Sequence, residues 1–168
     1  MARTHLAITA ELVSGGQHAA LWPQPGRIMI ASRSATFEQF AESVDNAFGR
    51  WDRSHLHEFT LAEGTSISPA KWWDGDEPEG SLDGSKARLG RLRCGDQFAY
   101  VFDLGDAWHI SAPWLLDWPT RWRPSAPSRT GRLPWFGWGD IPDQYGRRDP
   151  VALNAGCVPR GISVLLCD

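Results

Sequence analysis

Residues 97–112 constrain the fold more than any other part of the chain. Large apolar side chains alternate with smaller or polar ones along this segment, and the alternation is interrupted once, at Leu104-Gly105-Asp106. Successive side chains of a strand point to opposite faces of a sheet, so the pattern predicts two half-buried strands joined by a tight turn. We expect Gly105 and Asp106 to form a two-residue turn, because a type II′ turn needs a positive φ at its first position.

This turn fixes the register of the predicted hairpin. It places Asp103 opposite Trp108, with Asp106 at the tip, so that Asp103 and Trp108 share one face. The residues predicted to share the other face are Phe98, Tyr100, Phe102 and His109. Two carboxylates, a tryptophan and a histidine therefore gather near one turn, divided between two faces.

Hydrophobic periodicity predicts strands and one helix upstream of the hairpin. Residues 5–13 alternate and predict a half-buried strand, and residues 26–34 predict a second strand that can pair with the first. Thr36 and Gln39 have the spacing of a helix capping box, and apolar residues recur at helical spacing over residues 37–48. These residues predict a helix with one face on a sheet.

The segment between this helix and the hairpin is less regular. The second half of residues 50–61 alternates and predicts a third strand, and residues 86–93 predict a weaker one. Residues 67–85 are acidic and contain glycine and proline, which is typical of a surface loop. After Pro113 the pattern no longer indicates regular structure clearly, although residues 162–166 could add an edge strand or bury an end of the core.

The predicted elements define an α+β fold, with a mixed sheet of about five strands and one main helix on one face. A β-grasp-like arrangement is one option for this sheet. We expect residues 1–118 to form the core domain. Residues 119–168, rich in Trp, Pro and Arg, are expected to form a C-terminal extension that packs on the core and covers the sheet.

Charge and hydropathy limit the classes of partner that the chain is expected to bind. The 17 basic and 20 acidic residues give a net charge of -3, so no overall field attracts nucleic acid. A local nucleic-acid contact would rest on arginines interleaved with tryptophans, although arginine packed on tryptophan is the plainer interpretation. These arginines are Arg121, Arg123, Arg129 and Arg132. No apolar run approaches the roughly 20 residues of a membrane span, and none suits a signal peptide, so we expect a cytoplasmic protein with no membrane partner.

Three cysteines are widely spaced and lack a Cys-x-x-Cys pair. They are Cys94, Cys157 and Cys167. This spacing argues against a structural zinc site and a disulfide framework, so we expect free thiols.

The residues best suited to metal binding or catalysis lie in the third predicted strand and at the hairpin tip. His55 and His57 are two apart, so on a regular strand they project to the same face. Together with a carboxylate from Asp103 or Asp106, and with His109 as a further ligand, they could hold a divalent metal ion. Such an ion would activate water in a hydrolase or nuclease. This hypothesis requires an imidazole nitrogen of each strand histidine within about 6 Å of a hairpin carboxylate, since ligand bonds are about 2.0 to 2.2 Å long.

The plainer interpretation is that these histidines hydrogen-bond to their neighbours and that Asp106 is a turn residue. We therefore favour a non-catalytic binding module for a protein, peptide or nucleic-acid partner, with no cofactor, and keep the metal-dependent enzyme as the alternative. The candidate binding residues are Trp51, His55, His57, Asp103, Asp106, Trp108 and His109.

Several motifs occur together in the order and spacing of a known family. They are Thr36-Phe37, Phe48-Gly-Arg-Trp-Asp52, Ser54-His-Leu-His-Glu-Phe59, and Phe98-Ala-Tyr-Val-Phe-Asp-Leu-Gly-Asp106 followed by Trp108. The chain resembles the Ri-plasmid ORF-3-like proteins, often labelled TnpR passengers of insertion elements, over residues 5–112. Residues 138–146 are similar to a tail found in one branch of that family.

The resemblance implies an α+β protein of mobile genetic elements with no established activity. The TnpR label suggests a resolvase, but serine recombination needs a serine nucleophile in an arginine cluster and a DNA-binding helix-turn-helix. Ser32-Arg33-Ser34 is a poor match, and no second helical domain follows. The family also places a histidine two residues after the hairpin tryptophan, where this chain has Ile110; its own histidine is one residue earlier, at His109.

Overall fold

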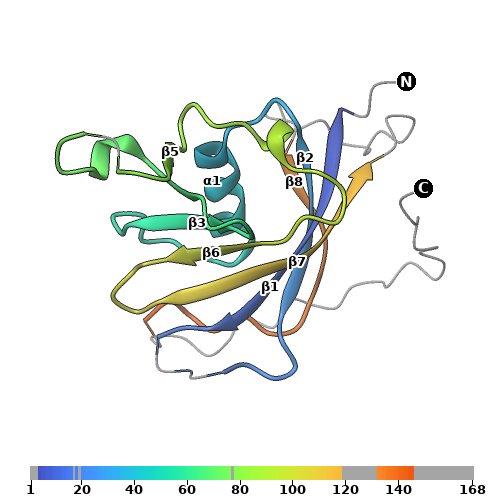
Figure 1. The fold of residues 1–168 in the computed structure, drawn as a ribbon. Helices are drawn as coiled ribbons and strands as arrows, with labels where there is room; N and C mark the ends of the chain where they lie inside the picture. The colour runs from blue at the N-terminus through green and yellow to red at the C-terminus, as the bar shows by residue number, and fades with distance from the viewer. Residues whose placement is uncertain (1–3, 17, 19, 77, 119–131, 146–168) are drawn as a thin grey trace.

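The computed structural model describes residues 4–16, 18, 20–76, 78–118 and 132–145. Within these residues, eight strands form one mixed sheet in the order β5-β4-β3-β6-β7-β1-β2-β8, and one α-helix packs on it (Figure 1). Neighbouring strands are antiparallel except β4 and β5, which are parallel. The strands are β1 (His5–Ser14), β2 (Gly26–Ser32), β3 (His57–Leu61), β4 (Ser66–Ser68), β5 (Ser81–Asp83), β6 (Phe98–Phe102), β7 (Trp108–Trp118) and β8 (Arg132–Trp138). The helices are α1 (Phe37–Ala47) and the 3-10 turns η1 (Ala70–Trp72) and η2 (Leu89–Arg91).

The α+β class is confirmed, but the prediction of about five strands is wrong. Two of the additional strands, β4 and β5, span three residues each; β4 overlaps the start of the segment predicted to be a loop, and β5 lies inside it. Conversely, residues 86–93 form no strand. They form a turn around η2 that buries Leu89 and Leu92, which are three residues apart rather than two.

Strand structure also continues past Pro113, where the pattern did not indicate it clearly. Pro113 lies where the pairing of β1 with β7 shifts register, between Thr9 opposite Trp114 and Glu11 opposite Ser111, and a bulge of this kind tolerates proline. Pro134 lies in β8, which is at the edge of the sheet beside β2. The described part of the C-terminal extension lengthens the sheet at its edge through β8, and Ile141 beyond it is buried in the core.

The structure also bears on the predictions about the arginines, the cysteines and a membrane span. Arg121, Arg123 and Arg129 lie outside the described residues, and the side chain of Arg132 is not described. Cys94 is disulfide-bonded, so the prediction of a free thiol is wrong for it; Cys157, Cys167 and residues 162–166 lie outside the described residues. No helix in the described ranges is long and apolar enough to cross a membrane.

The core lies between the sheet and α1. The prediction of a half-buried strand at residues 5–13 is confirmed, because alternate apolar side chains of β1 are each at most 2% exposed: Leu6, Ile8, Ala10 and Leu12. Phe37, Phe40 and Val44 of α1 belong to the same cluster, and the ring of Phe40 stacks on that of Phe59 in β3.

The predicted capping box at the start of α1 is present. The Thr36 hydroxyl accepts a hydrogen bond from the backbone N–H of Gln39, and the Gln39 side chain accepts one from the backbone N–H of Thr36. We expect Thr36→Ala to lower the free energy of unfolding by about 1 kcal/mol, because it leaves a helix N–H without its acceptor. Urea denaturation checks this, with Thr36→Ser as the matched control that keeps the hydroxyl. Equal losses in the two variants would contradict a capping role.

The predicted register of the hairpin is wrong by one residue. Phe102 pairs with Trp108, and Val101 pairs with His109, so residues 103–107 form the connection. The positive φ angles fall on Asp103 (54°) and Ala107 (49°) and not on Gly105. This wider turn closes because the Asp103 carboxylate accepts from the N–H groups of Gly105 and Asp106, and the Asp103 carbonyl accepts from the N–H of Ala107.

The register decides which side chains enter the core. Trp108 is 1% exposed and lies on the inward face together with Tyr100 and Phe102, whereas His109 is exposed on the opposite face. The one-residue displacement of the histidine relative to the family pattern therefore changes its face, and the inward position is occupied by Ile110.

Candidate functional site

The loop that follows α1 is held in place by residues near the end of the described chain. Gln144 is buried, and its side-chain oxygen accepts hydrogen bonds from the backbone N–H groups of Trp51 and Asp52, both at 3.1 Å. Its side-chain nitrogen donates to the Asp52 carbonyl, also at 3.1 Å. Arg50 donates to the carbonyls of Phe48 and Pro142 at 2.9 and 2.7 Å. These bonds position the side chains of residues 51–55 against the tail.

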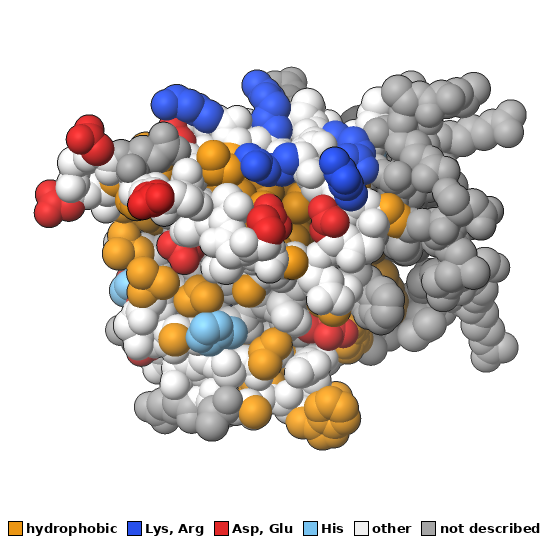
Figure 2. Space-filling model, in the orientation of Figure 1, with side chains coloured by type: hydrophobic (Ala, Val, Ile, Leu, Met, Phe, Trp, Pro, Cys, Tyr) orange, Lys and Arg blue, Asp and Glu red, His pale blue; other side chains and the backbone are white. Residues whose placement is uncertain are grey.

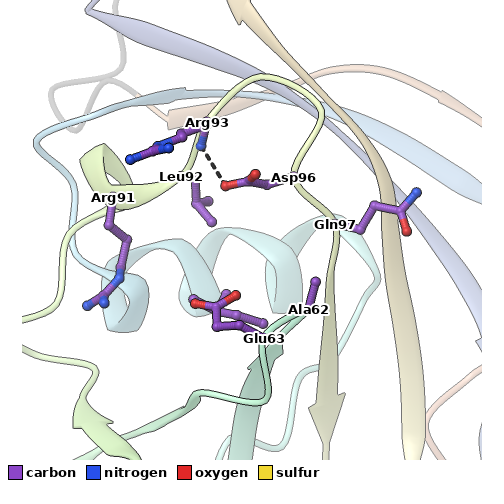
Figure 3. Close-up of a pocket in the computed structure, with 8 residues that line it drawn as sticks. Ala62, Glu63, Arg91, Leu92, Arg93, Asp96 and Gln97 are labelled. Atoms are coloured by element: carbon purple, nitrogen blue, oxygen red, sulfur yellow. Dashed lines mark hydrogen bonds between the residues drawn. The ribbon is translucent and has the colours of Figure 1, made fainter.

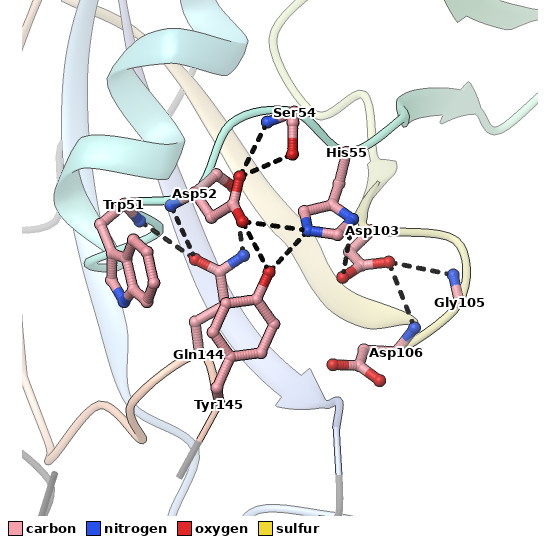
Figure 4. A network of polar contacts seen from close by, with 9 residues as sticks. All are labelled: Trp51, Asp52, Ser54, His55, Asp103, Gly105, Asp106, Gln144 and Tyr145. Carbon is pink, nitrogen blue, oxygen red and sulfur yellow. Dashed lines mark hydrogen bonds and ion pairs between the residues drawn. The ribbon is translucent and has the colours of Figure 1, made fainter. Parts of the chain in front are cut away.

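His55 connects this loop to the hairpin and to the tail (Figure 4). Its Nδ1 lies 3.2 Å from Oδ2 of Asp103, in the hairpin turn. Its Nε2 lies 2.6 Å from the hydroxyl of Tyr145 and 3.6 Å from Oδ2 of Asp52. The Tyr145 hydroxyl in turn donates to Oδ2 of Asp52 at 2.9 Å. Three segments far apart in sequence are thus joined through one imidazole ring.

Hydrogen bonds and partial burial set the charge states of Asp52 and Tyr145. The hydroxyl and backbone N–H of Ser54 and the hydroxyl of Tyr145 lower the pKa of Asp52 to about 2, so this carboxylate is ionised at neutral pH. Partial desolvation and the neighbouring Asp52 carboxylate raise the pKa of Tyr145. Tyr145 therefore stays protonated as a donor, which is the opposite of what an activated tyrosine nucleophile requires.

His57 does not join this cluster. It begins β3, its ring packs edge-on against Trp72 with centroids 4.7 Å apart, and a second contact joins it to Tyr100 at 5.7 Å. Its Nε2 is buried and lacks a hydrogen-bond partner among the described residues, and burial lowers its pKa to about 4. The prediction of a shared face assumed a regular strand, but His55 lies before the first residue of β3.

The other candidate residues divide between the cluster and the core. Trp51 is 53% exposed, and its ring lies edge-on to that of Tyr145 at 5.3 Å. Asp106 is exposed at the hairpin tip, where its carbonyl accepts from the N–H of Gly16 at 2.7 Å. Trp108 belongs to the core instead, with the guanidinium of Arg50 stacked 4.1 Å over its ring.

The described candidate ligands do not form a cluster of the kind that holds a metal ion. Within the described ranges, no three His, Cys, Asp or Glu side chains are grouped so that they could hold an ion. His55 satisfies the distance expected of it towards Asp103, but Asp52 and Asp103 contact different nitrogens of the same ring.

Exposed apolar side chains flank members of the polar cluster along the chain. Leu56 follows His55 and is 43% exposed, and Leu104 follows Asp103 and is 54% exposed. The Leu56 carbonyl accepts a hydrogen bond from the backbone N–H of Asp103 at 2.8 Å, which joins the backbones of the two segments. We use the name His55 surface for the cluster and its apolar rim: Trp51, Asp52, His55, Leu56, Asp103, Leu104, Asp106 and Tyr145.

Sequence reasoning missed the contributions of Asp52, Gln144 and Tyr145 to this surface. Asp52 was recognisable as part of a family motif, but its role depends on contacts with the tail. Gln144 and Tyr145 carry no periodic pattern, and their partners are about 90 residues away in sequence, at Asp52 and His55.

The fold and the site define an α+β domain whose His55 surface joins a post-helix loop, a hairpin turn and a C-terminal segment. Residues 22–112, more than half of the chain, match the model of a protein family described as plasmid pRiA4b ORF-3-like protein. The chain belongs to this family, as the sequence motifs predicted. The matched range includes His55 and Asp103 but not Gln144 or Tyr145, so the tail's part of the surface lies outside it.

A solved structure shares the fold. It is the crystal structure of MM3350, a protein of unknown function from Methanosarcina mazei Go1, with 18% sequence identity and a TM-score of 0.55. The similarity covers 72% of this chain and 66% of that chain, which is slightly less than two thirds of its length. No curated protein matches the chain.

Proposed function

We propose that the chain is a non-catalytic binding module whose His55 surface holds a peptide segment of a partner protein, and that this segment carries both cationic and apolar side chains. The observation that carries the proposal is the presence of three exposed apolar side chains, Trp51, Leu56 and Leu104, on the same segments as Asp52 and Asp103, whose carboxylates are fixed by hydrogen bonds.

The apolar rim supplies anchoring groups. Trp51, Leu56 and Leu104 are three of the four large apolar side chains that are strongly exposed within the described residues. Single exposed apolar side chains are common, but a group of them on one surface is typical of an interaction site. Tryptophan is among the residues that contribute most to binding at protein interfaces.

The carboxylates favour a cationic partner. Asp52 is ionised at neutral pH, and Asp106 stands exposed at the hairpin tip beside the rim. The nearest arginine in the loop, Arg53, is directed to the side chain of Asn46 on α1. A Lys or Arg side chain of the partner would find charge complementarity here, which supports specificity and the rate of association.

The same geometry explains why we favour binding over catalysis. Both nitrogens of His55 are engaged, one with Asp103 and the other with Tyr145, so the ring links three segments and offers no free nitrogen to a substrate. Such links also fix the surface before binding, which lowers the conformational entropy lost when a partner docks.

A selection from a random peptide library displayed on phage tests this function. We expect enriched peptides to combine Lys or Arg with aromatic or aliphatic residues, and a synthetic peptide of the enriched sequence to bind the protein measurably in solution. Trp51→Ala should lower the affinity of the protein for that peptide at least tenfold, as expected when a residue that anchors the interface is lost. Trp22→Ala is the matched control, because Trp22 is 88% exposed and lies in the connection between β1 and β2.

The control should change the affinity less than about twofold, as expected of a surface residue outside the contact. Enrichment of acidic peptides, or an equal loss of affinity in the Trp51 and Trp22 variants, would contradict the proposal. A selection that enriches no sequence over a blank surface would contradict it as well.

A further inference from the structure

We infer that a second surface, formed by arginines around η2, binds the phosphate backbone of duplex DNA. This inference goes beyond the proposed peptide site, since none of its residues belongs to the His55 surface. We call this surface the arginine patch; it consists of Arg33, Arg88, Arg91 and Arg93.

The 3-10 turn η2 sets the geometry of the patch. Arg88 caps the turn and Arg91 ends it, with the N–H of Arg91 donating to the Arg88 carbonyl at 3.2 Å. Arg88 precedes the turn in extended conformation and reaches the Ser34 carbonyl, whereas Arg91 lines the neighbouring cavity. Leu89 and Leu92 are at most 2% exposed and anchor the turn in the core, whereas Arg88, Arg91 and Arg93 are exposed.

A second segment adds to the patch and fixes it. Arg33 follows β2, and its Nη1 donates to the carbonyl of Leu92 at 2.8 Å. In the reverse direction, Nη1 of Arg88 donates to the carbonyl of Ser34. The two segments are thus held together by hydrogen bonds from their own arginines, which fixes the positions of Arg33 and Arg88 before any ligand binds.

The outer arginines of the patch are not neutralised. Arg91 and Arg93 make no ion pair with any residue that the structure describes, whereas Lys71 pairs with Glu38 at 3.6 Å and Lys86 pairs with Asp83 at 3.2 Å. Figure 2 shows Lys and Arg side chains gathered along the upper part of one face, with Asp and Glu side chains at the loop on its left and below them. Positive charge is therefore concentrated locally in a chain whose net charge is negative.

The neighbouring cavity indicates that the ligand is a polymer. A cavity of about 340 Å³ lies beside the patch, between the end of β3 and residues 91–97 (Figure 3). Two carboxylates, Glu63 and Asp96, line it together with Arg91 and Arg93, and the Asp96 carboxylate accepts a hydrogen bond from the backbone N–H of Arg93 at 2.7 Å. A small anion entering this cavity would meet two carboxylates as well as two arginines. An extended anion that also reaches Arg88 and Arg33 outside the cavity contacts more positive charge, which suits repeated phosphates on a long backbone.

The composition of the patch favours duplex over single-stranded nucleic acid. Proteins that hold single strands combine positive charge with aromatic side chains on which bases stack. The strongly exposed large apolar residues of the described chain are Trp22, Trp51, Leu56 and Leu104, and none of them belongs to the patch. Contacts to phosphates alone carry no sequence information, so binding should be independent of sequence.

Fluorescence anisotropy with a labelled 24-base-pair DNA duplex and the full chain tests the inference. The logarithm of the binding constant should fall linearly with the logarithm of the salt concentration, and about three phosphate contacts predict a slope near -2.7. The affinity should therefore fall roughly 40-fold between 50 and 200 mM salt. Arg91→Glu and Arg93→Glu should each weaken binding at 50 mM salt at least tenfold and reduce the slope by about 1.

Arg53→Glu is the matched control, since it changes the net charge equally at an exposed arginine far along the chain from the patch. It should leave the affinity for the duplex within about twofold of the unmodified protein, provided that circular dichroism shows each variant to be folded. The inference is overturned if the protein does not bind the duplex at 50 mM salt, or if Arg53→Glu weakens binding as much as Arg91→Glu. Tighter binding of a single-stranded 24-mer than of the duplex would overturn it too.

Discussion

Replacing Trp108 with alanine should lower the free energy of unfolding by about 3–5 kcal/mol, the usual cost of removing a large buried aromatic side chain. Trp108 is 1% exposed, and a Cβ atom built on Gly15 would lie only 2.5 Å from its ring. The Arg50 guanidinium stacks over the ring and would lose this support. The substitution therefore removes apolar burial and loosens the buried arginine that holds the tail through Pro142.

Urea unfolding monitored by circular dichroism measures this loss. Trp22→Ala provides the matched control, because the same side chain is removed at a position that is 88% exposed, and its effect should stay within about 0.5 kcal/mol. A loss below about 1.5 kcal/mol for Trp108→Ala would contradict the register in which Trp108 pairs with Phe102 on the inward face.

The second large effect concerns the pH dependence of stability, where two buried groups oppose each other. Burial raises the pKa of Asp45 to about 7, although Tyr100 donates a hydrogen bond to its carboxylate at 2.7 Å. Between its ordinary pKa near 3.9 and pH 7 the folded state binds a proton that the unfolded state does not, so this group makes stability fall as pH rises. Arg53 and Arg50 act against this shift, and Glu42 adds to it.

His57 acts in the other direction over nearly the same range. Its pKa is lowered to about 4, first by burial and then by Lys71. Between pH 4 and its ordinary pKa near 6.5 the unfolded state binds the proton that the folded state lacks, so this group makes stability rise with pH. The two contributions largely cancel in the unmodified protein over this interval.

Single substitutions should uncover each contribution. In Asp45→Asn, stability should rise by roughly 2 kcal/mol between pH 4.5 and 6.5 relative to the unmodified protein, because only the His57 contribution remains. In His57→Gln it should fall over the same range by a similar amount. Urea unfolding at pH 4.5, 5.5 and 6.5 provides the measurement, and slopes of the same sign in the two variants would contradict the account.

The parts of the fold that sequence predicted correctly depend on local periodicity. The alternation of Leu6, Ile8, Ala10 and Leu12 identified β1, and the capping box of Thr36 and Gln39 located the start of α1. These patterns report which face is buried and how a helix begins, and both are decided by neighbouring residues. Strands β4 and β5, at three residues each, are too short to show a period.

The hairpin shows where a local rule was overridden. Gly105-Asp106 suits a two-residue turn, but the Asp103 carboxylate caps the N–H groups of both residues and stabilises a wider connection. Competition between side-chain caps and regular backbone bonding is a known property of Asp in turns. The shift reversed the predicted faces of Trp108 and His109.

The candidate site was predictable only in part, because it depends on pairings between distant segments. The sequence singled out His55 and Asp103, which contact each other. It also singled out His57, whose burial under Trp72 depends on a 3-10 turn that no periodicity revealed. The bonds from Gln144 and Tyr145 to the post-helix loop leave no trace in local patterns, so the tail's role emerges only from the structure.

The central claim is that the His55 surface is a site for a cationic, partly apolar peptide. Isothermal titration calorimetry with the selected peptide and two charge-adding variants, Leu104→Lys and Trp22→Lys, tests it most directly. Both variants remove an exposed apolar side chain and add one positive charge, but only Leu104 lies beside the Asp103 turn. We predict that Leu104→Lys lowers the affinity for the peptide at least tenfold, whereas Trp22→Lys leaves it within about twofold of that of the unmodified protein. Equal affinities of the two variants for the peptide would contradict the claim.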